Sequence, residues 1–285
     1  MQSNDEIKNK LNSSIEKMPS LPTTVGKIVQ LANDINSSAK DILAVIQLDP
    51  VVAAKVMKLI NSAYYGMPNK VSLKQAVVLL GINTIKNLAL SSAIVTQLGK
   101  NQIAIKSFDQ HRFWEHSLGT AITCRVICKK LGTDPGEVDE FFVSGLIHDL
   151  GKVVLALSVP LLYSKALKQS EDNKLDSVTA ERENIGIDHA EVGSMLGRKW
   201  SLNEMLVDSI LNHHKPTAES GKLTWVVHVA NHFASTHGYA NTGEYVEPWV
   251  DPQACEKLGI ERAEIEAGLS DLTEEIEKAS VFLQS

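Results

Sequence analysis

The sequence lacks the features of several large protein classes. It has only three cysteines, and Cys124 and Cys128 stand four residues apart in an apolar helical pattern, which argues against a disulfide framework and for a reduced, cytoplasmic protein. No window approaches about 18 uninterrupted apolar residues, and Met1 to Ser20 has no apolar signal-peptide core, so we expect neither a membrane span nor a signal peptide. The net charge of −6 argues against direct binding of nucleic acid.

Helical periodicity is present almost everywhere. Apolar residues recur three or four positions apart, as in Val52, Val56 and Leu59, and no stretch alternates as a strand does. Asp49 followed by Pro50 is typical of a helix start, and Asp134 followed by Pro135 starts the helix that would carry His148 and Asp149 in the same way. Residues from about 251 onward predict one or two amphipathic helices that pack on the core or on a partner. The sequence therefore predicts an all-helical protein.

Gly145 to Lys152, with the sequence GLIHDLGK, holds the most informative pair of residues. His148 and Asp149 offer a nitrogen and an oxygen ligand, a mixed set that suits Zn, Fe or Mn. On a helix the two would reach one ion only over the edge between them, with further ligands from other helices. Gly151 would let a ligand approach the backbone, and Lys152 adds a cation one turn away. The structural alternative is that Asp149 accepts a hydrogen bond from His148 or caps a helix.

Four more histidines allow two interpretations each. His116 lies among apolar neighbours in a predicted helix from Phe113 to Cys128, where a histidine bonded within the core is the more common case. His189 follows Asp188 in DHAE, a capping box that opens a helix. A second such box, SLNE from Ser201, opens the next helix, which ends at His213 and His214. A protonated histidine is favourable near a helix C-terminus, and at these two positions this interpretation is as good as metal ligation. We assign no chemistry to 161–184, a more polar stretch.

Two loops in the first part of the chain have specific sequences. Asn61 to Pro68, NSAYYGMP, ends an amphipathic helix with two tyrosines, a glycine and a proline that prevents continuation. Aromatic packing at a helix end is a simpler interpretation of this loop than a ligand pocket. Leu79 to Ile85, LLGINTI, indicates a tight turn between helices at Gly81.

These segments resemble the HDOD family, the HD-related output domains of bacterial signalling proteins. The resemblance rests on LPTTVGKIVQL from Leu21, IQLDPVVAAKVMKLINSAYYG from Ile46 and VSLKQAVVLLGINTIKNLAL from Val71, and it covers Met18 to about Phe233. It implies an all-helical fold with an N-terminal helical subdomain, residues 1–105, packed on an HD-domain-like helical bundle, residues 106–285. It also implies that the chain is a largely non-catalytic relative of HD metallohydrolases.

The resemblance also implies a set of metal ligands. HD domains carry a first histidine on the helix before the doublet, and the two-metal site of HD-GYP cyclic-dinucleotide phosphodiesterases adds later histidines around a bridging aspartate. Asn231 stands where that family has a last aspartate, which should weaken the hold on one ion, and no Gly-Tyr-Pro segment is present; Gly238-Tyr239-Ala240 is a faint echo of it. The expected ligands of one or two Fe, Mn or Zn ions are His116, His148, Asp149, His189, His213, His214 and Asn231.

Three functions fit these residues. The first is a signalling module whose pocket binds metal, and a nucleotide or another phosphorylated small ligand, and which other signalling proteins contact. The second is a metal-dependent phosphohydrolase or phosphodiesterase, in which Asp149 would hold the metal and Lys152 would offset charge on the phosphoryl oxygens. The third is a scaffold whose histidines are held by hydrogen bonds alone. None of the three requires nucleic acid or a membrane.

Overall fold

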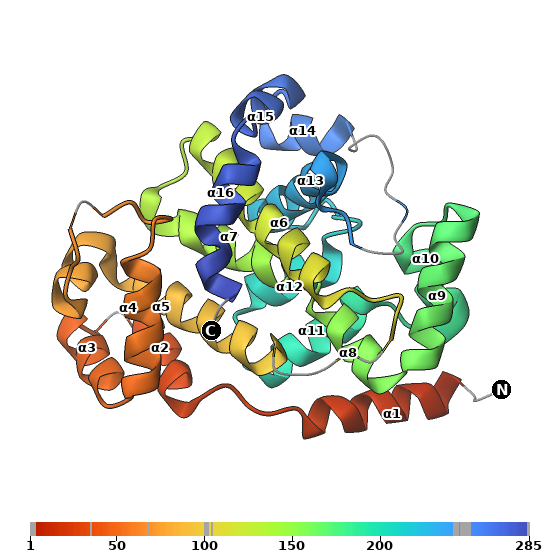
Figure 1. Cartoon of the computed structure of the whole chain (residues 1–285), viewed down its shortest axis with the longest axis horizontal. Helices are drawn as coiled ribbons and strands as arrows, with labels where there is room; N and C mark the ends of the chain where they lie inside the picture. The colour runs from red at the N-terminus through yellow and green to blue at the C-terminus, as the bar shows by residue number, and fades with distance from the viewer. Residues whose placement is uncertain are drawn as a thin grey trace.

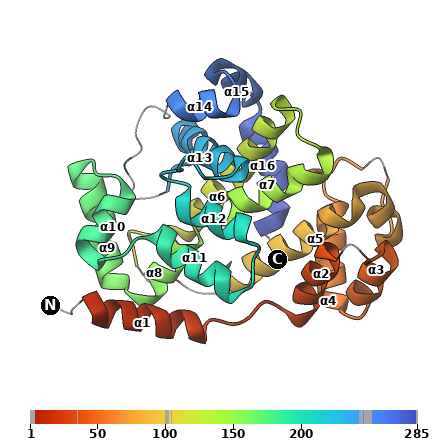
Figure 2. The ribbon, with the colours of Figure 1, turned by 180° about the vertical axis from the view of Figure 1, so that it is seen from behind.

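The computed structural model confirms the all-helical prediction (Figures 1 and 2). Within the part of the chain that the structure describes, every regular element is a helix. The described residues are 4–34, 36–67, 69–99, 103, 105–241, 245 and 252–283.

The first part of the chain forms a small helical unit at one end of the molecule (Figure 1). Asp49 begins α4 as predicted, because its carboxylate accepts hydrogen bonds from the backbone N–H groups of Val51 and Val52. The turn predicted at Gly81 is a break inside one long helix, where Gly81 takes φ 82°. The helices are α2 (Thr23–Asn33), α3 (Ala39–Gln47), α4 (Pro50–Ile60) and α5 (Leu73–Gly99).

The second half of α5 joins this unit to the rest of the protein. It is buried almost throughout from Thr84 onward and packs against α7 (Pro135–Ile147). Thr84 donates a hydrogen bond of 2.6 Å to Asp139 on α7, and both side chains are buried. The predicted packing of an N-terminal helical unit on a helical bundle is therefore confirmed.

The first helix, α1 (Asn4–Lys17), extends away from that unit along the lower edge of Figure 1 and packs on α8 and α11. Lys199 donates to the carbonyl of Ile15 at 2.7 Å, and the indole of Trp200 donates to that of Pro19 at 3.0 Å. The segment before α2 thus packs on the bundle, and a domain boundary near residue 105 stays a prediction.

The bundle that follows surrounds the central helices α6 and α7, which have the most extensive mutual packing in the described chain. Predicted starts hold at Asp134 and Asp188, whose carboxylates cap α7 and α11. The capping box at Asp188 is only half formed, because the Glu191 carboxylate accepts from Arg182 instead. The SLNE prediction was wrong in detail: Ser201 takes φ 54°, and Asn203 caps α12 instead. The bundle helices are α6 (Gln110–Lys130), α7, α8 (Leu150–Ser158), α9 (Pro160–Asn173), α10 (Ser177–Ile185), α11 (His189–Lys199), α12 (Glu204–Asn212) and α13 (Lys222–Ala234).

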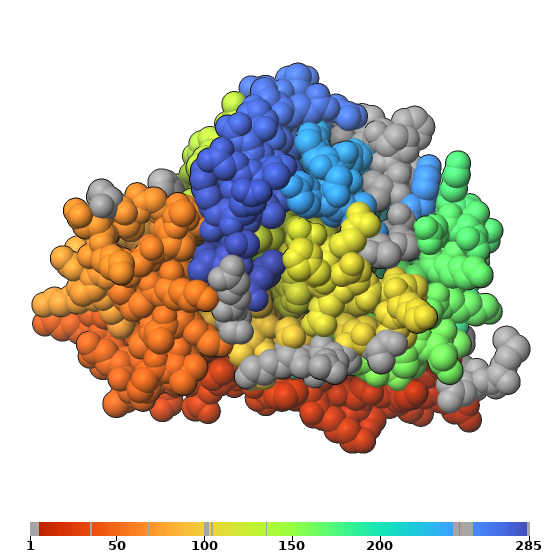
Figure 3. Space-filling view, viewed as in Figure 1, coloured from red at the N-terminus to blue at the C-terminus, as the bar shows by residue number. Residues whose placement is uncertain are grey.

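The C-terminal segment forms three short α-helices rather than the one or two that we expected. They are α14 (Pro252–Leu258), α15 (Arg262–Gly268) and α16 (Leu272–Ala279), followed by a 3-10 turn at Ser280–Leu283. They lie across α6 and α13 and lean toward the N-terminal unit (Figure 3). Phe282 packs against Tyr64 and Phe142, with ring centroids 5.5 and 5.0 Å apart. The C-terminal segment thereby connects the NSAYYG loop to the bundle.

Two helical stretches have the length and hydropathy of a membrane span, although neither is an uninterrupted apolar run. In Leu73–Gly99 and Gly136–Ser158, 67% and 94% of the apolar window is buried inside the protein. Core helices pass the same test, and this degree of burial assigns both stretches to the core.

Candidate metal centre

The His148-Asp149 pair lies at a junction between two helices, not inside one helix as we expected. Helix α7 ends at Ile147 and α8 begins at Leu150, with His148 and Asp149 as the residues between them. The backbone of Asp149 leaves the helical range, at φ −99° and ψ 12°. This break brings both side chains toward the centre of the bundle, where they are fully buried.

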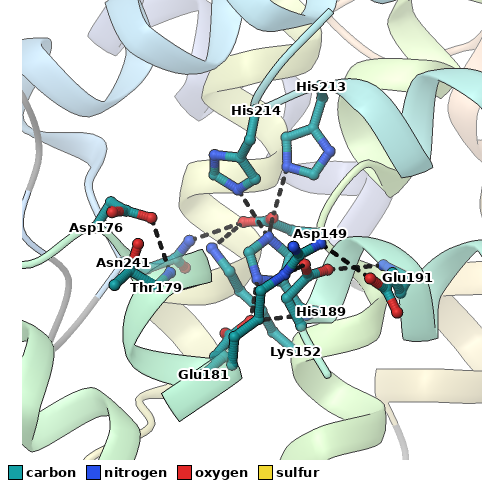
Figure 4. Close-up of polar contacts among 12 residues, drawn as sticks. Asp149, Lys152, Asp176, Thr179, Glu181, His189, Glu191, His213, His214 and Asn241 are labelled. Atoms are coloured by element: carbon teal, nitrogen blue, oxygen red, sulfur yellow. Dashed lines mark hydrogen bonds and ion pairs between the residues drawn. The ribbon is translucent and has the colours of Figure 1, made fainter. Parts of the chain in front are cut away.

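Gly151 has a different role from the predicted one. A Cβ atom added there would lie 1.8 Å from the carbonyl oxygen of His189 and 2.7 Å from the backbone nitrogen of Gly193. The missing side chain therefore allows the start of α11 to approach α8, rather than a ligand to approach the backbone. This close approach places His189 beside Asp149 (Figure 4).

Five histidines from four parts of the chain converge on Asp149. His116 Nε2 and His148 Nε2 each lie 3.4 Å from its Oδ2 atom, on one side. On the other side, the Nε2 atoms of His189 and His213 lie 3.2 and 3.5 Å from Oδ1. His214 joins this second side through a distance of 2.8 Å between its Nε2 and that of His189. The structure thus brings together all the predicted ligands except Asn231.

Hydrogen bonds from Nδ1 to backbone carbonyls orient three of these rings. The Nδ1 atoms of His116, His148 and His213 donate to the backbone carbonyls of Tyr239, Gly145 and Ile210, respectively, at 2.7 to 2.8 Å. A carbonyl only accepts, so Nδ1 carries the proton, and in the neutral ring Nε2 presents a lone pair to the cluster. Second contacts of this kind are typical of metal-ligating histidines.

The spacing of the ligand atoms fits a metal ion. Nitrogen and oxygen atoms bound at about 2.0 to 2.1 Å to one ion lie about 2.8 to 3.5 Å from one another. The distances across each side of Asp149 fall in this range. Asp149 Oδ1 and His213 Nε2 are also buried without a hydrogen-bond partner among the described residues. A cation on the Oδ1 side would satisfy both atoms.

The Oδ2 side already contains donors from the protein. Lys152 Nζ lies 2.6 Å from Asp149 Oδ2, and Asn241 Nδ2 donates to the same oxygen at 3.0 Å. Both residues are buried. We did not predict Asn241 from the sequence; its only signal was its position two residues after Tyr239, in the segment that faintly echoes Gly-Tyr-Pro.

Burial and charge set the protonation states of the cluster. Burial alone would raise the pKa of Asp149, but His148 and Lys152 together hold it well below its usual value. Burial lowers the pKa of His213 to about 3 and, together with the nearby His213 and His189, holds that of His214 well below its usual value. Burial also lowers the pKa of His148. These three rings are therefore neutral at pH 7, as metal ligation requires.

His189 differs because a buried carboxylate faces its outer nitrogen. Glu181 Oε2 accepts hydrogen bonds from the backbone nitrogen and from Nδ1 of His189, both at 2.7 Å. Burial would lower the pKa of His189, but Glu181 outweighs it and raises the pKa to about 10. Burial raises the pKa of Glu181. Glu181 lies in the stretch to which we assigned no chemistry, yet it shares the buried face of α10 with Ser177 and Ile185, four residues to either side.

Asn231 lies half-buried on α13, where its backbone carbonyl accepts a hydrogen bond from the N–H of Ser235. Its role as a ligand stays a prediction. On the same helix, His228 bonds through Nδ1 to the carbonyl of His213 at 2.7 Å. His228 therefore positions the end of α12, where His213 and His214 stand.

The cluster is closed to solvent on most sides. The side chains of His148, Asp149, His189 and His213 have no exposed surface, and His116 is 1% exposed. His214 is partly exposed, so it is the ligand through which the centre reaches the surface. A phosphorylated substrate would need a wider opening than one imidazole edge, unless the chain moves.

Known proteins resemble this chain in sequence and in structure. The family model of the HDOD domain matches residues 18–216. The crystal structure of an HDOD domain protein with unknown function from Geobacter sulfurreducens is 25% identical, with a TM-score of 0.74 over 96% of this chain and 98% of that one. A provisionally named phosphohydrolase from Shewanella amazonensis is 24% identical, with a TM-score of 0.73 over 96% and 98% of the two chains, and shows the same fold.

A curated "uncharacterized protein" of Treponema pallidum (strain Nichols) is 27% identical over 207 residues. The match covers 70% of this chain but 38% of that relative, so the chain spans well under half of its length. The family match covers most of the chain, including His116, the His148-Asp149 pair and the three later histidines. The protein therefore belongs to the HDOD family.

Proposed function

We propose that this protein is a bacterial, cytoplasmic signalling module whose buried centre holds one divalent transition-metal ion, Fe, Mn or Zn, without efficient catalysis. The ligands are Asp149 Oδ1, His189, His213 and His214. Membership of the HDOD family supports a signalling role, with other signalling proteins as partners. The three free cysteines, two of them buried, are compatible with a reducing compartment.

The observation that carries this proposal is the number of protein ligands around one position. Four ligand atoms, from Asp149, His189, His213 and His214, lie within 4.8 Å of one another. Structural sites commonly use four protein ligands, whereas catalytic zinc sites commonly use three and keep one position for water. Four ligands in a buried centre favour an ion that stabilises the bundle over one that activates water.

A metal-dependent phosphohydrolase or cyclic-dinucleotide phosphodiesterase is the second candidate. The second group of ligand atoms, from His116, His148 and Asp149, supports it, because two ions sharing one carboxylate are a known hydrolytic arrangement. A bound ion would supply an acidified water there. Lys152 would then have to turn from Asp149 Oδ2 toward a phosphoryl oxygen. Its Nζ atom lies 2.6 Å from Oδ2, and both side chains are buried, which opposes that movement.

Elemental analysis of protein purified without added metal, followed by phosphatase and cyclic-dinucleotide assays with Mn or Fe, separates these functions. We expect up to one ion per chain and little or no turnover. The Asp149→Asn variant should lose the ion, and Asp149→Asn with Lys152→Met controls for the buried lysine that the single change leaves unpaired. Brisk hydrolysis that His148→Ala abolishes would establish the enzyme instead, and protein without metal would indicate the scaffold.

A further inference from the structure

A second pocket lies between the NSAYYG loop, α6 and the C-terminal helices. We propose that it binds a small phosphorylated molecule carrying a flat apolar group, a mononucleotide being the simplest example. The pocket has a volume of about 340 Å³, within the range of ligand sites. It is lined by Tyr64, by Ile122, Arg125, Val126, Lys129 and Lys130 of α6, and by Gly268, Leu269, Asp271, Leu272 and Glu275.

Arg125 is the residue on which this proposal depends. Its guanidinium carbon lies 4.7 Å from the centre of the Tyr64 ring, so the side chain is held in place by stacking. Its Nε atom and the Tyr64 hydroxyl are both buried, and each interacts with the other residue without making a hydrogen bond of ordinary geometry. Arg125 also forms no ion pair within the described chain. The buried Asp139 acts on Arg125 only from beyond ion-pair distance. A half-buried guanidinium with no carboxylate in direct contact is a ready partner for phosphate.

The rest of the pocket extends the positive charge. Lys129 and Lys130 follow Arg125 along α6, and both are exposed at the pocket's rim. They also offset the carbonyl dipoles at the end of α6, so Arg125, one turn earlier, supplies the main attraction. The two acids do not cancel it: Glu275 already accepts from Lys278 at 2.9 Å, and Asp271 is exposed at the start of α16.

The apolar walls argue for more than inorganic phosphate. Ile122, Val126, Leu269 and Leu272 face the same pocket as the cations. A flat ring could lie between these side chains, with its phosphate at Arg125 and a hydroxyl or amino group donating to Asp271. The site differs from the metal centre, whose ligands are all elsewhere in the bundle, and it gives the NSAYYG loop a role that the metal centre does not.

Isothermal titration of the full chain with AMP and with GMP tests the proposal. At least one should bind more tightly than about 1 mM, and inorganic phosphate and the matching nucleoside should each bind at least about tenfold more weakly. Binding should weaken with added salt and should be equal for zinc-loaded and zinc-free protein. No binding, or equal affinity for inorganic phosphate, overturns the proposal, and loss of binding on chelation assigns the nucleotide to the metal centre instead.

Variants locate the binding. Arg125→Gln should weaken nucleotide affinity about tenfold or more, because a charge-assisted contact to phosphate is lost. Lys129→Gln with Lys130→Gln, both exposed, should weaken it about threefold and keeps the test valid if Arg125→Gln does not fold. Arg112→Gln, an exposed cation near the other end of α6, is the matched control and should bind as the wild type does. Equal affinity in the double lysine variant and in Arg112→Gln would overturn the proposal.

Discussion

The two oxygens of Asp149 have different surroundings. On the Oδ2 side the protein itself supplies two donors, Lys152 Nζ at 2.6 Å and Asn241 Nδ2 at 3.0 Å, besides two imidazoles at 3.4 Å. On the Oδ1 side it supplies three imidazoles, and one of them, His189, carries a positive charge in metal-free protein 3.2 Å from this oxygen. The Oδ2 side is neutralised by a lysine, whereas the positive charge on the Oδ1 side is a proton that a metal ion can replace.

This difference explains how a nearly complete two-metal ligand set can hold one ion. Two divalent ions bring four positive charges, and Asp149 is the only carboxylate among the ligand atoms grouped here. Lys152 already places one positive charge against it, and Glu181 contributes one negative charge behind His189. Charge balance in a buried site therefore favours a single ion on the side that Glu181 supports.

The largest expected effect comes from removing one histidine on each side. His213→Ala should weaken metal affinity by more than about a hundredfold, because the loss of a direct ligand exceeds the usual effect of outer contacts. His148→Ala should change it by less than about threefold. Competition with a chromophoric zinc chelator measures both. Equal losses would mean that the two sides share the ion, and a greater loss in His148→Ala would reverse the assignment.

Glu181 allows a smaller and more selective change. Glu181→Gln keeps an acceptor for His189 but removes its charge, so zinc affinity should fall about tenfold to a hundredfold. Glu183→Gln, on the same helix but exposed, is the matched control. Equal zinc affinity in Glu181→Gln and the wild type would show that the ion does not depend on His189.

The Oδ2 side can be altered to hold an ion. Asn241→Asp should raise the metal content from about one to about two ions per chain, because a second carboxylate would offset the added charge. Metal-free protein should lose about 1 to 3 kcal/mol of stability, since two buried carboxylates would then face each other. Elemental analysis and urea unfolding measure the two effects. Asn231→Asp is the informative comparison: if it adds the ion and Asn241→Asp does not, Asn231 faces the first ion.

Two histidines on the Oδ1 side should make the stability of metal-free protein depend on pH in opposite directions. The pKa of His213 is about 3 in the folded protein, below the ordinary value near 6.5, so its contribution to stability is lost as pH falls from 6.5 toward 3. The pKa of His189 is about 10, so its contribution is lost as pH rises from 6.5 through 10. Urea unfolding in chelator should show both slopes.

His213→Gln should flatten the acid slope, and His189→Gln should flatten the alkaline one. Zinc should also remove the alkaline slope and release about one proton near pH 8, because the ion replaces the proton on His189 Nε2. Unchanged slopes in either variant would contradict the assignment of charge within the cluster.

Much of this protein was predictable from local sequence. Apolar spacing predicted helices throughout, and Asp49, Asp134 and Asp188 marked helix starts correctly, because a cap depends on residues within one turn. Ser201 was the exception. The backbone turns there with φ 54° and Asn203 takes the cap, an outcome that depends on how α11 and α12 pack.

The candidate ligands were named from the sequence only with the help of the family resemblance, because each histidine taken alone also fitted a structural role. Their division into two unequal sides was not predicted. Glu181, Lys152 and Asn241 reach the cluster from α10, α8 and the segment after α13, and no local pattern relates those positions. The sequence alone therefore determined the helices and the candidate ligands, whereas the charge around each oxygen of Asp149 depends on distances across the packed bundle and was decided only by the tertiary structure.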